Sequence, residues 1–151
     1  MRMKIYDYTD YPDLNPDEKL IINMNSAVLT FHTEKDILTF RNTHPNWLLL
    51  YDLKLNDEDY MHARMAFNAY GDIVSVQSSI SDQTLHNLMI ITGFCHGNLL
   101  MDVRHCDHPD QQAERAYKTG IRYMIGADYP GMITCTYESV QHDASDEKED
   151  I

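Results

Sequence analysis

The chain has 151 residues, 12 of them basic and 24 acidic, which gives a formal net charge of −12 at pH 7. Tight, non-specific binding of nucleic acid is not expected, because such binding needs clustered Lys and Arg against the phosphates. No apolar run approaches the ~20 residues of a membrane span, and the N-terminus lacks an apolar signal core. We therefore expect an intracellular protein without a membrane contact, and leave a nuclear or a cytoplasmic location open. Three scattered cysteines do not make a disulfide framework.

The first 46 residues divide into an arm and an extension. Residues 1–18 are acidic and rich in tyrosine, and they form either an arm packed on the domain or a flexible leader. Residues 19–46 are expected to form short strands over 20–24 and 27–31, followed by a helix that begins at the capping sequence Thr33-Glu34-Lys35-Asp36.

The next segment alternates strand, helix and strand. Trp47 to Leu53 has the length and composition of a strand. Polar residues at 56–59 favour a helix start, and Gly71 is expected to end that helix in the left-handed conformation. Residues 72–80 are expected to form a strand that is buried mainly on one face.

The second half of the chain repeats this alternation less clearly. Residues 81–98 could form a helix capped by Ser81, or a strand hairpin; the hairpin is preferred because Ile90, Ile91 and Thr92 favour strands. A strand over 99–105, a helix from Pro109 to Ile121 and a strand from Met132 to Val140 follow. The charged residues 141–151 are expected to form a disordered acidic tail.

Residues 47–140 resemble an RNA-recognition motif (RRM), in a degenerate form. The likeness rests on Leu48 to Leu53, on Phe67 with Tyr70-Gly71, on the octamer from His96 to Val103, and on the helix from Pro109. The resemblance implies an α+β, ferredoxin-like domain: an antiparallel sheet with helices on one face. Residues 19–46 would then be half of another such unit, or extra strands on the same sheet.

The resemblance also implies a sheet face that meets partners. RRM proteins stack bases on aromatic side chains of this face, but here the stacking positions fall on Leu49, Asn98 and Leu100. With Tyr51 and Asp102, which alternation places on the same face, they would form a surface for protein contacts. The chain is accordingly predicted to be a non-catalytic interaction or dimerisation module of a ribonucleoprotein or regulatory assembly, with a protein partner or a second copy of itself bound there.

The sequence also allows two alternative functions. Single-stranded RNA could bind weakly through Trp47, Tyr51, His96 and Arg104, which would replace the missing aromatic side chains. The charge of −12 would also suit an acidic inhibitor that mimics nucleic acid.

The sequence contains no recognisable catalytic or metal-binding motif. No nucleophile–base pair, no paired acids and no phosphate-binding glycine loop is recognisable, so neither an enzyme nor a cofactor is predicted. Zinc could be suggested by Cys95-His96 together with His105-Cys106-Asp107-His108. However, an extended strand over nine residues would separate His96 from His105 by about 30 Å, and no metal site is predicted.

Overall fold

The computed structural model describes residues 1–29 and 33–140. The described residues form seven strands, four α-helices and two short 3-10 helices. The strands are β1 (Arg2–Asp7), β2 (Leu20–Asn23), β3 (Trp47–Leu55), β4 (Ile73–Gln77), β5 (Asn98–Asp102), β6 (Tyr123–Ile125) and β7 (Ile133–Tyr137). The helices are η1 (Tyr8–Asp13), η2 (Asn25–Leu29), α1 (Glu34–Thr43), α2 (His62–Asn68), α3 (Asp82–Cys95) and α4 (Pro109–Thr119).

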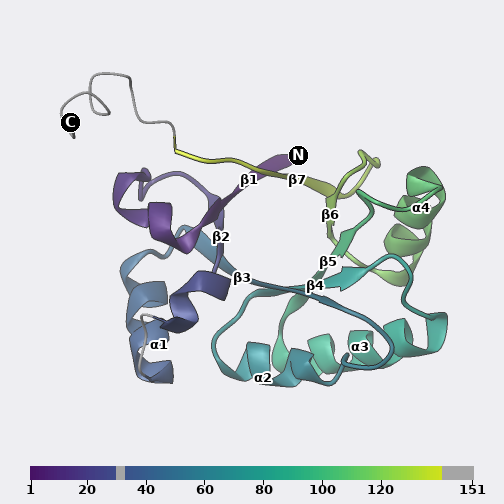
Figure 1. Ribbon diagram of the computed structural model, residues 1–151, viewed down its shortest axis with the longest axis horizontal. Helices are drawn as coiled ribbons and strands as arrows, with labels where there is room; N and C mark the ends of the chain where they lie inside the picture. Colours follow the sequence, from purple (N-terminus) through teal and green to yellow (C-terminus); the bar gives the residue numbers. More distant parts are fainter. Residues whose placement is uncertain (30–32, 141–151) are drawn as a thin grey trace.

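The seven strands form one closed barrel in which every pair of neighbours is parallel. The barrel closes where β1 pairs with β7, with Ile5 opposite Tyr137. The α-helices lie outside this ring (Figure 1). The predicted antiparallel ferredoxin-like sheet is therefore wrong, and so is the RRM assignment. Strands β1 and β2 belong to the same barrel as the strands of residues 47–140.

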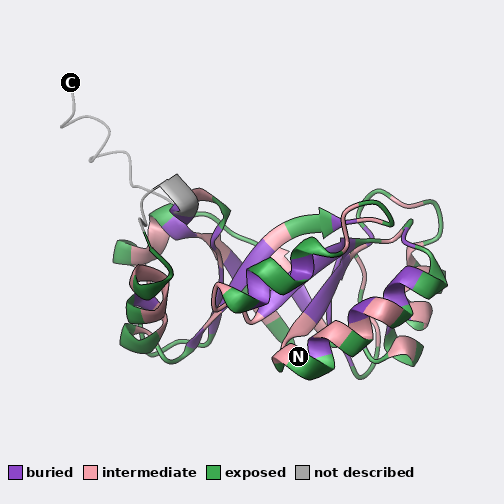
Figure 2. Cartoon of the chain, turned by 90° about the horizontal axis from the view of Figure 1, so that it is seen from below, coloured by how far each residue is buried: buried purple, intermediate pink, exposed green. Residues whose placement is uncertain are grey.

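Strands of a parallel barrel face the barrel core on one side and the outer helices on the other, so both of their faces are buried. The first four residues of β4 are all buried, so this strand is not buried mainly on one face as predicted. One apolar cluster contains strand residues and fills the barrel: Ile5, Ile21, Leu50, Ile73, Leu100, Tyr123, Ile125 and Cys135. The second cluster combines the alternate strand residues with the inner faces of the helices, and Figure 2 shows this burial on the strands and the inward helix faces.

The wall formed by β1 and β7 differs from the rest, because no α-helix of the described residues covers it (Figure 1). The side chains that alternate with the barrel-filling ones are polar here: Arg2, Lys4, Thr134 and Thr136. A polar outer face has little apolar area to hide from water, so no covering helix is required.

The helix predictions were mixed. The box at Thr33 is confirmed: its hydroxyl accepts the Asp36 amide and the Asp36 carboxylate accepts the Thr33 amide. The preferred hairpin over 81–98 is wrong, because α3 occupies this region and Ser81 caps it. The left-handed residue after α2 is Tyr70 (φ 65°) rather than Gly71. Residues 27–29 lie in η2 instead of a strand; 30–32, and the tail of 141–151, lie outside the described residues.

Two strands, β1 and β6, were not predicted. No helix long and apolar enough to cross a membrane occurs within residues 1–29 and 33–140.

Candidate active site in the barrel mouth

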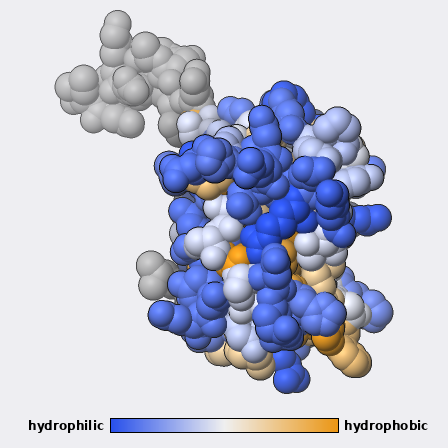
Figure 3. Space-filling view, turned by 90° about the vertical axis from the view of Figure 1, so that its right-hand side faces the viewer, coloured by the Kyte–Doolittle hydropathy of each residue, from blue (hydrophilic) through white to orange (hydrophobic). Residues whose placement is uncertain are grey.

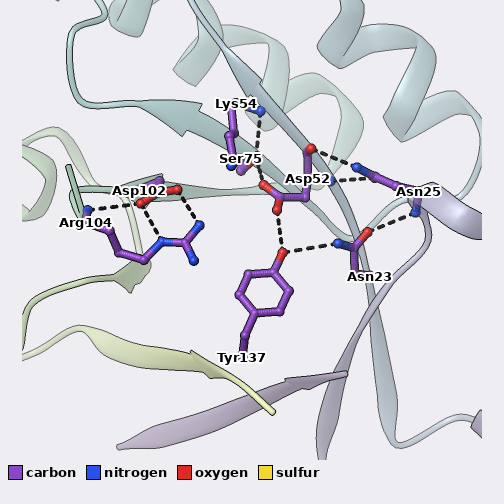
Figure 4. A network of polar contacts seen from close by, with 8 residues as sticks. All are labelled: Asn23, Asn25, Asp52, Lys54, Ser75, Asp102, Arg104 and Tyr137. Atoms are coloured by element: carbon purple, nitrogen blue, oxygen red, sulfur yellow. Dashed lines mark hydrogen bonds and ion pairs between the residues drawn. The ribbon is translucent and has the colours of Figure 1, made fainter. Parts of the chain in front are cut away.

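Polar side chains gather where the carboxyl ends of the strands meet. In a closed parallel barrel all these ends lie at one mouth, and enzymes with barrels of this kind carry their active sites there. The mouth residues, which come from β2 to β5 and β7, are Asn23, Asp52, Lys54, Ser75, Asp102, Arg104 and Tyr137 (Figure 4). Apolar side chains fill the barrel below them, so they form a polar layer over an apolar floor.

The carboxylate of Asp52 is the centre of this layer. One of its oxygens accepts the hydroxyl of Ser75 (Oγ to Oδ1, 2.6 Å), and the other accepts the hydroxyl of Tyr137. The backbone of Asp52 is held as well: its N–H donates to Asn25 Oδ1, and its carbonyl accepts Asn25 Nδ2, both at 2.9 Å. Asp52 is thus fixed from three neighbouring segments, as a reacting group must be.

The phenol of Tyr137 connects β7 to β2 and β3. It accepts a hydrogen bond from Asn23 Nδ2 at 3.2 Å while donating to Asp52. Burial raises the pKa of Tyr137 well above its ordinary value of 10, and the hydrogen bond to Asp52 raises it further. The phenol therefore stays protonated and serves as a donor.

Lys54 lies at the barrel mouth, in the irregular last part of β3. The register with β4 shifts between Tyr51 and Leu55, and Lys54 has a φ of 49°. Residues other than glycine rarely adopt this backbone conformation, and residues that do so cluster at functional sites. The N–H of Lys54 donates to Ser75 Oγ at 2.8 Å. Within the part of the chain that the structure describes, the ammonium group has no hydrogen bond or ion pair.

A second carboxylate, Asp102, lies on the β5 side. Arg104 donates to both of its oxygens, from Nε at 3.1 Å and from an Nη at 2.8 Å. Burial alone would raise the pKa of Asp102, but the hydrogen bonds from Arg104 outweigh it and, with the nearby charge of Lys54, bring the pKa below its ordinary value. The guanidinium of Arg104 also lies 5.4 Å from the ring centre of Tyr137.

The arrangement can stabilise developing negative charge and transfer protons. Lys54 offers an ammonium without a hydrogen-bond or ion-pair partner among the described residues, and two carboxylates, Asp52 and Asp102, lie on the strands β3 and β5 that flank β4. In a site partly shielded from water, such groups act strongly on charge that forms during a reaction. The search for paired acids in the sequence missed this arrangement, because Asp52 and Asp102 are 50 residues apart in the sequence and come to the same mouth only in the barrel.

The structure places the predicted partner-binding residues in different settings. Leu49 and Leu100 are buried, at 0% and 2% exposure, on opposite sides of the barrel wall. Tyr51 is also buried and donates its hydroxyl to the Ala69 carbonyl. Asn98 begins β5, and only Asp102 reaches the mouth. The barrel has no open sheet face, so the reason for grouping these five is removed. The expectation of a protein partner or a homodimer stays a prediction.

The residues assigned to RNA do not share a surface. Trp47 is buried at the start of β3 and stacks on His44 at 4.3 Å, while Arg104 lies beyond the opposite end of β5. Tyr51 is buried and His96 ends α3 in the left-handed conformation. RNA binding through these four residues is not supported.

The two groups of residues that could have suggested a zinc site lie at opposite ends of β5. Cys95 and His96 precede the strand, whereas residues 105–108 follow it. Among the described residues no group of three or more His, Cys, Asp or Glu side chains is placed to hold a metal ion.

Comparisons with known proteins bear on the fold. No family model matches the sequence, and no curated protein matches it. The structure is similar to a 3-hexulose-6-phosphate synthase (TM-score 0.63, 18% identity, covering 87% of this chain and 70% of that one). It is also similar to the 3-keto-L-gulonate-6-phosphate decarboxylase of Vibrio cholerae (0.59, 22%, 82% and 60%) and to the 3-hexulose-6-phosphate synthase of Salmonella typhimurium (0.61, 14%, 83% and 63%).

The fold is that of β/α-barrel enzymes. At these identities the likeness establishes the fold alone, and the chain spans between 60% and 70% of the length of these three structures. The closed parallel barrel overturns the prediction of an RRM-like module, and the matched structures are those of enzymes rather than of RRM proteins. It gives no support to the RNA-binding and nucleic-acid-mimic alternatives either.

Proposed function

We propose that this protein is an enzyme whose active site is the barrel mouth, with Lys54, Asp52 and Asp102 as its reacting groups. The observation that carries the proposal is the position of Lys54: a strained backbone presents an ammonium without a hydrogen-bonding partner in the described chain, beside two fixed carboxylates. The left-handed backbone conformation costs stability, and a purely structural role would not require it.

The substrate class is taken from the structural neighbours. Their names refer to a keto sugar phosphate and a keto sugar-acid phosphate, and we propose a phosphorylated, hydroxylated ketone for this chain too. Breaking or forming a carbon–carbon bond beside a ketone places negative charge on the ketone oxygen. The Lys54 ammonium would stabilise that oxygen or protonate the adjacent carbon.

The carboxylates have distinct roles in this proposal. Asp52 is held by two hydroxyl donors, which keep it oriented toward the mouth next to Lys54. Asp102 keeps its charge because Arg104 donates to both of its oxygens, and the nearby charge of Lys54 also lowers the pKa of this carboxylate.

The test is an assay with two compounds, 3-keto-L-gulonate 6-phosphate and 3-hexulose 6-phosphate, followed by carbon NMR. We expect the purified chain to convert at least one of them faster than the buffer does, with release of carbon dioxide or of an aldehyde. Absence of conversion of both compounds by a folded protein would contradict the proposed substrate class.

A further inference from the structure

A pocket with a volume of about 550 Å³ adjoins the barrel mouth. It lies between the carboxyl ends of β3, β4 and β5 and the first turns of α4. Lys54 and Asp102 form part of its wall. A ligand that reaches the proposed reacting groups can therefore extend into this pocket.

Most of the remaining wall is polar. It carries two amides, two hydroxyls and two imidazoles, from Gln77, Gln112, Ser78, Ser79, His105 and His108, together with the thiol of Cys106 and the carboxylate of Asp107. Amides and hydroxyls each donate and accept hydrogen bonds. Hydroxyl groups of a ligand also donate and accept, so this wall matches them better than it matches an apolar group.

We infer that this pocket is the subsite for the hydroxylated carbon chain of the substrate, and that Arg115 positions its wall. The inference rests on the proposed function, which supplies the reacting end of the same ligand. It assigns the specificity for chain length to residues 77–79 and 105–112.

Arg115 joins the two segments that enclose the pocket. Its Nη atoms donate to the carbonyls of Ser78 (3.2 Å) and Ile80 (2.5 Å), in the loop after β4. The same guanidinium donates to Gln112 Oε1 at 3.1 Å and to Asp82 Oδ1 at 2.8 Å. Arg115 does not itself line the pocket. It is a positioning residue, which fixes the distance between α4 and the loop that carries the two serines.

The helix α4 supplies a matched control. Lys118 is three residues along and pairs with Glu114 at 3.2 Å, with 71% of its side chain exposed. It holds nothing at the pocket. The surface on this side of the molecule, viewed from the right of Figure 1, is mainly hydrophilic (Figure 3), and a charge can be removed there with little structural effect.

The experiment measures chain-length selectivity by calorimetry with two probes. Sorbitol 6-phosphate carries a six-carbon hydroxylated chain, and ethylene glycol monophosphate carries a two-carbon chain with the same phosphate. We expect the wild-type protein and Lys118→Gln to bind the long probe at least tenfold more tightly than the short one. In Arg115→Gln this ratio should fall close to one, and in Arg115→Lys it should be partly restored.

A substitution in the pocket wall itself keeps the inference testable if the Arg115→Gln protein does not fold. Gln77→Ala removes an exposed amide from the pocket and should reduce the ratio between threefold and tenfold, about the effect of one hydrogen bond. A wild-type protein that does not distinguish the probes would overturn the inference. So would folded Arg115→Gln with an unchanged ratio or, if that variant does not fold, Gln77→Ala with an unchanged ratio.

The same data separate this inference from the proposed function. A protein that selects the long probe but converts neither keto sugar phosphate would retain the subsite and lose the proposed reaction. A protein that converts them without selecting the long probe would retain the reaction and lose the subsite.

Discussion

The hydroxyl oxygen of Ser75 lies 2.8 Å from the backbone nitrogen of Lys54 and accepts its hydrogen bond. The contact crosses from β4 to the irregular end of β3, where the regular ladder is interrupted. Ser75 is completely buried, and its hydroxyl donates a hydrogen bond to Asp52. One buried hydroxyl therefore positions both the ammonium-bearing residue and the central carboxylate.

Replacing Ser75 by Ala tests this connection. The substitution leaves the Lys54 amide without its acceptor and removes one donor to Asp52, so we expect the free energy of unfolding to fall by about 1–3 kcal/mol. Urea denaturation measures this. We expect kcat to fall by at least tenfold with a smaller change in KM. Thr39→Ala, which removes an exposed hydroxyl from α1, is the control; equal effects in both variants would argue against a special role for Ser75.

The strain at Lys54 can be measured separately from catalysis. Glycine adopts a φ of 49° without the steric cost that alanine meets. Lys54→Gly should accordingly be more stable than Lys54→Ala by about 1 kcal/mol, although both lack the ammonium group. If Lys54→Ala proves equally or more stable in urea, the left-handed conformation does not occur in solution.

The Asp102–Arg104 pair predicts a shift in acid stability. In the folded protein the pKa of Asp102 is lowered despite its burial, because Arg104 binds the carboxylate. The pair therefore stabilises the fold above the unfolded pKa, near 3.8, and this contribution is lost as the pH falls through the lower folded value.

In Arg104→Gln the charge of the guanidinium and its hydrogen bonds are lost while the hydrogen bond from the backbone N–H of residue 104 remains, so the pKa of Asp102 should rise above that in the wild-type protein. The loss of charge on Asp102 then occurs at higher pH, and stability at pH 7 should fall relative to stability at pH 3. Urea midpoints between these pH values give the test, with Lys118→Gln as the control. Parallel pH profiles for the wild-type protein and Arg104→Gln would show that the pair does not depress the pKa.

Two glycines near the end of α3 give opposite predictions. A Cβ at Gly97 would lie 2.2 Å from the ring of Phe67, whereas one at Gly93 meets nothing within 4 Å. We expect Gly97→Ala to lower the free energy of unfolding by about 1–3 kcal/mol through overpacking. Gly93→Ala, inside the helix, should raise it by about 0.5–1 kcal/mol. Stabilisation by both substitutions would contradict the close approach of Phe67 in α2 to Gly97.

Local signals in the sequence predicted several elements. The run from Trp47 identified β3, the box at Thr33 identified α1, and Pro109 identified the start of α4. The strand–helix–strand unit was also found, but an RRM shares that unit. Local pattern does not distinguish an antiparallel return from a parallel closure.

Two further features of the sequence indicate a parallel barrel. Strands β2 to β6 begin at 20, 47, 73, 98 and 123, so successive starts are 27, 26, 25 and 25 residues apart. Such regular alternation is typical of a parallel β/α fold. Continuous apolar runs such as Leu48-Leu49-Leu50 and Leu99-Leu100-Met101 also indicate strands buried on both faces.

The site could not be found by looking for nearby residues. Asp52, Ser75, Asp102 and Tyr137 each lie on a different strand and come together only when the barrel closes. The available signal was a polar side chain in the second half of an apolar strand, as at Asp52 and Asp102. The strands β1 and β6 were missed because one is half polar and the other is three residues long.

The most direct test of the account compares turnover by three proteins: the wild type, Lys54→Met, and Lys35→Met as a control on the exposed outer helix α1. Conversion of 3-keto-L-gulonate 6-phosphate and 3-hexulose 6-phosphate is followed by NMR at equal concentrations of folded protein. We expect the wild type and Lys35→Met to convert at least one compound at equal rates, and Lys54→Met to be slower by about 10²–10³-fold. Equal rates in the wild type and Lys54→Met, or no conversion by the wild type, would contradict a catalytic barrel mouth built around Lys54.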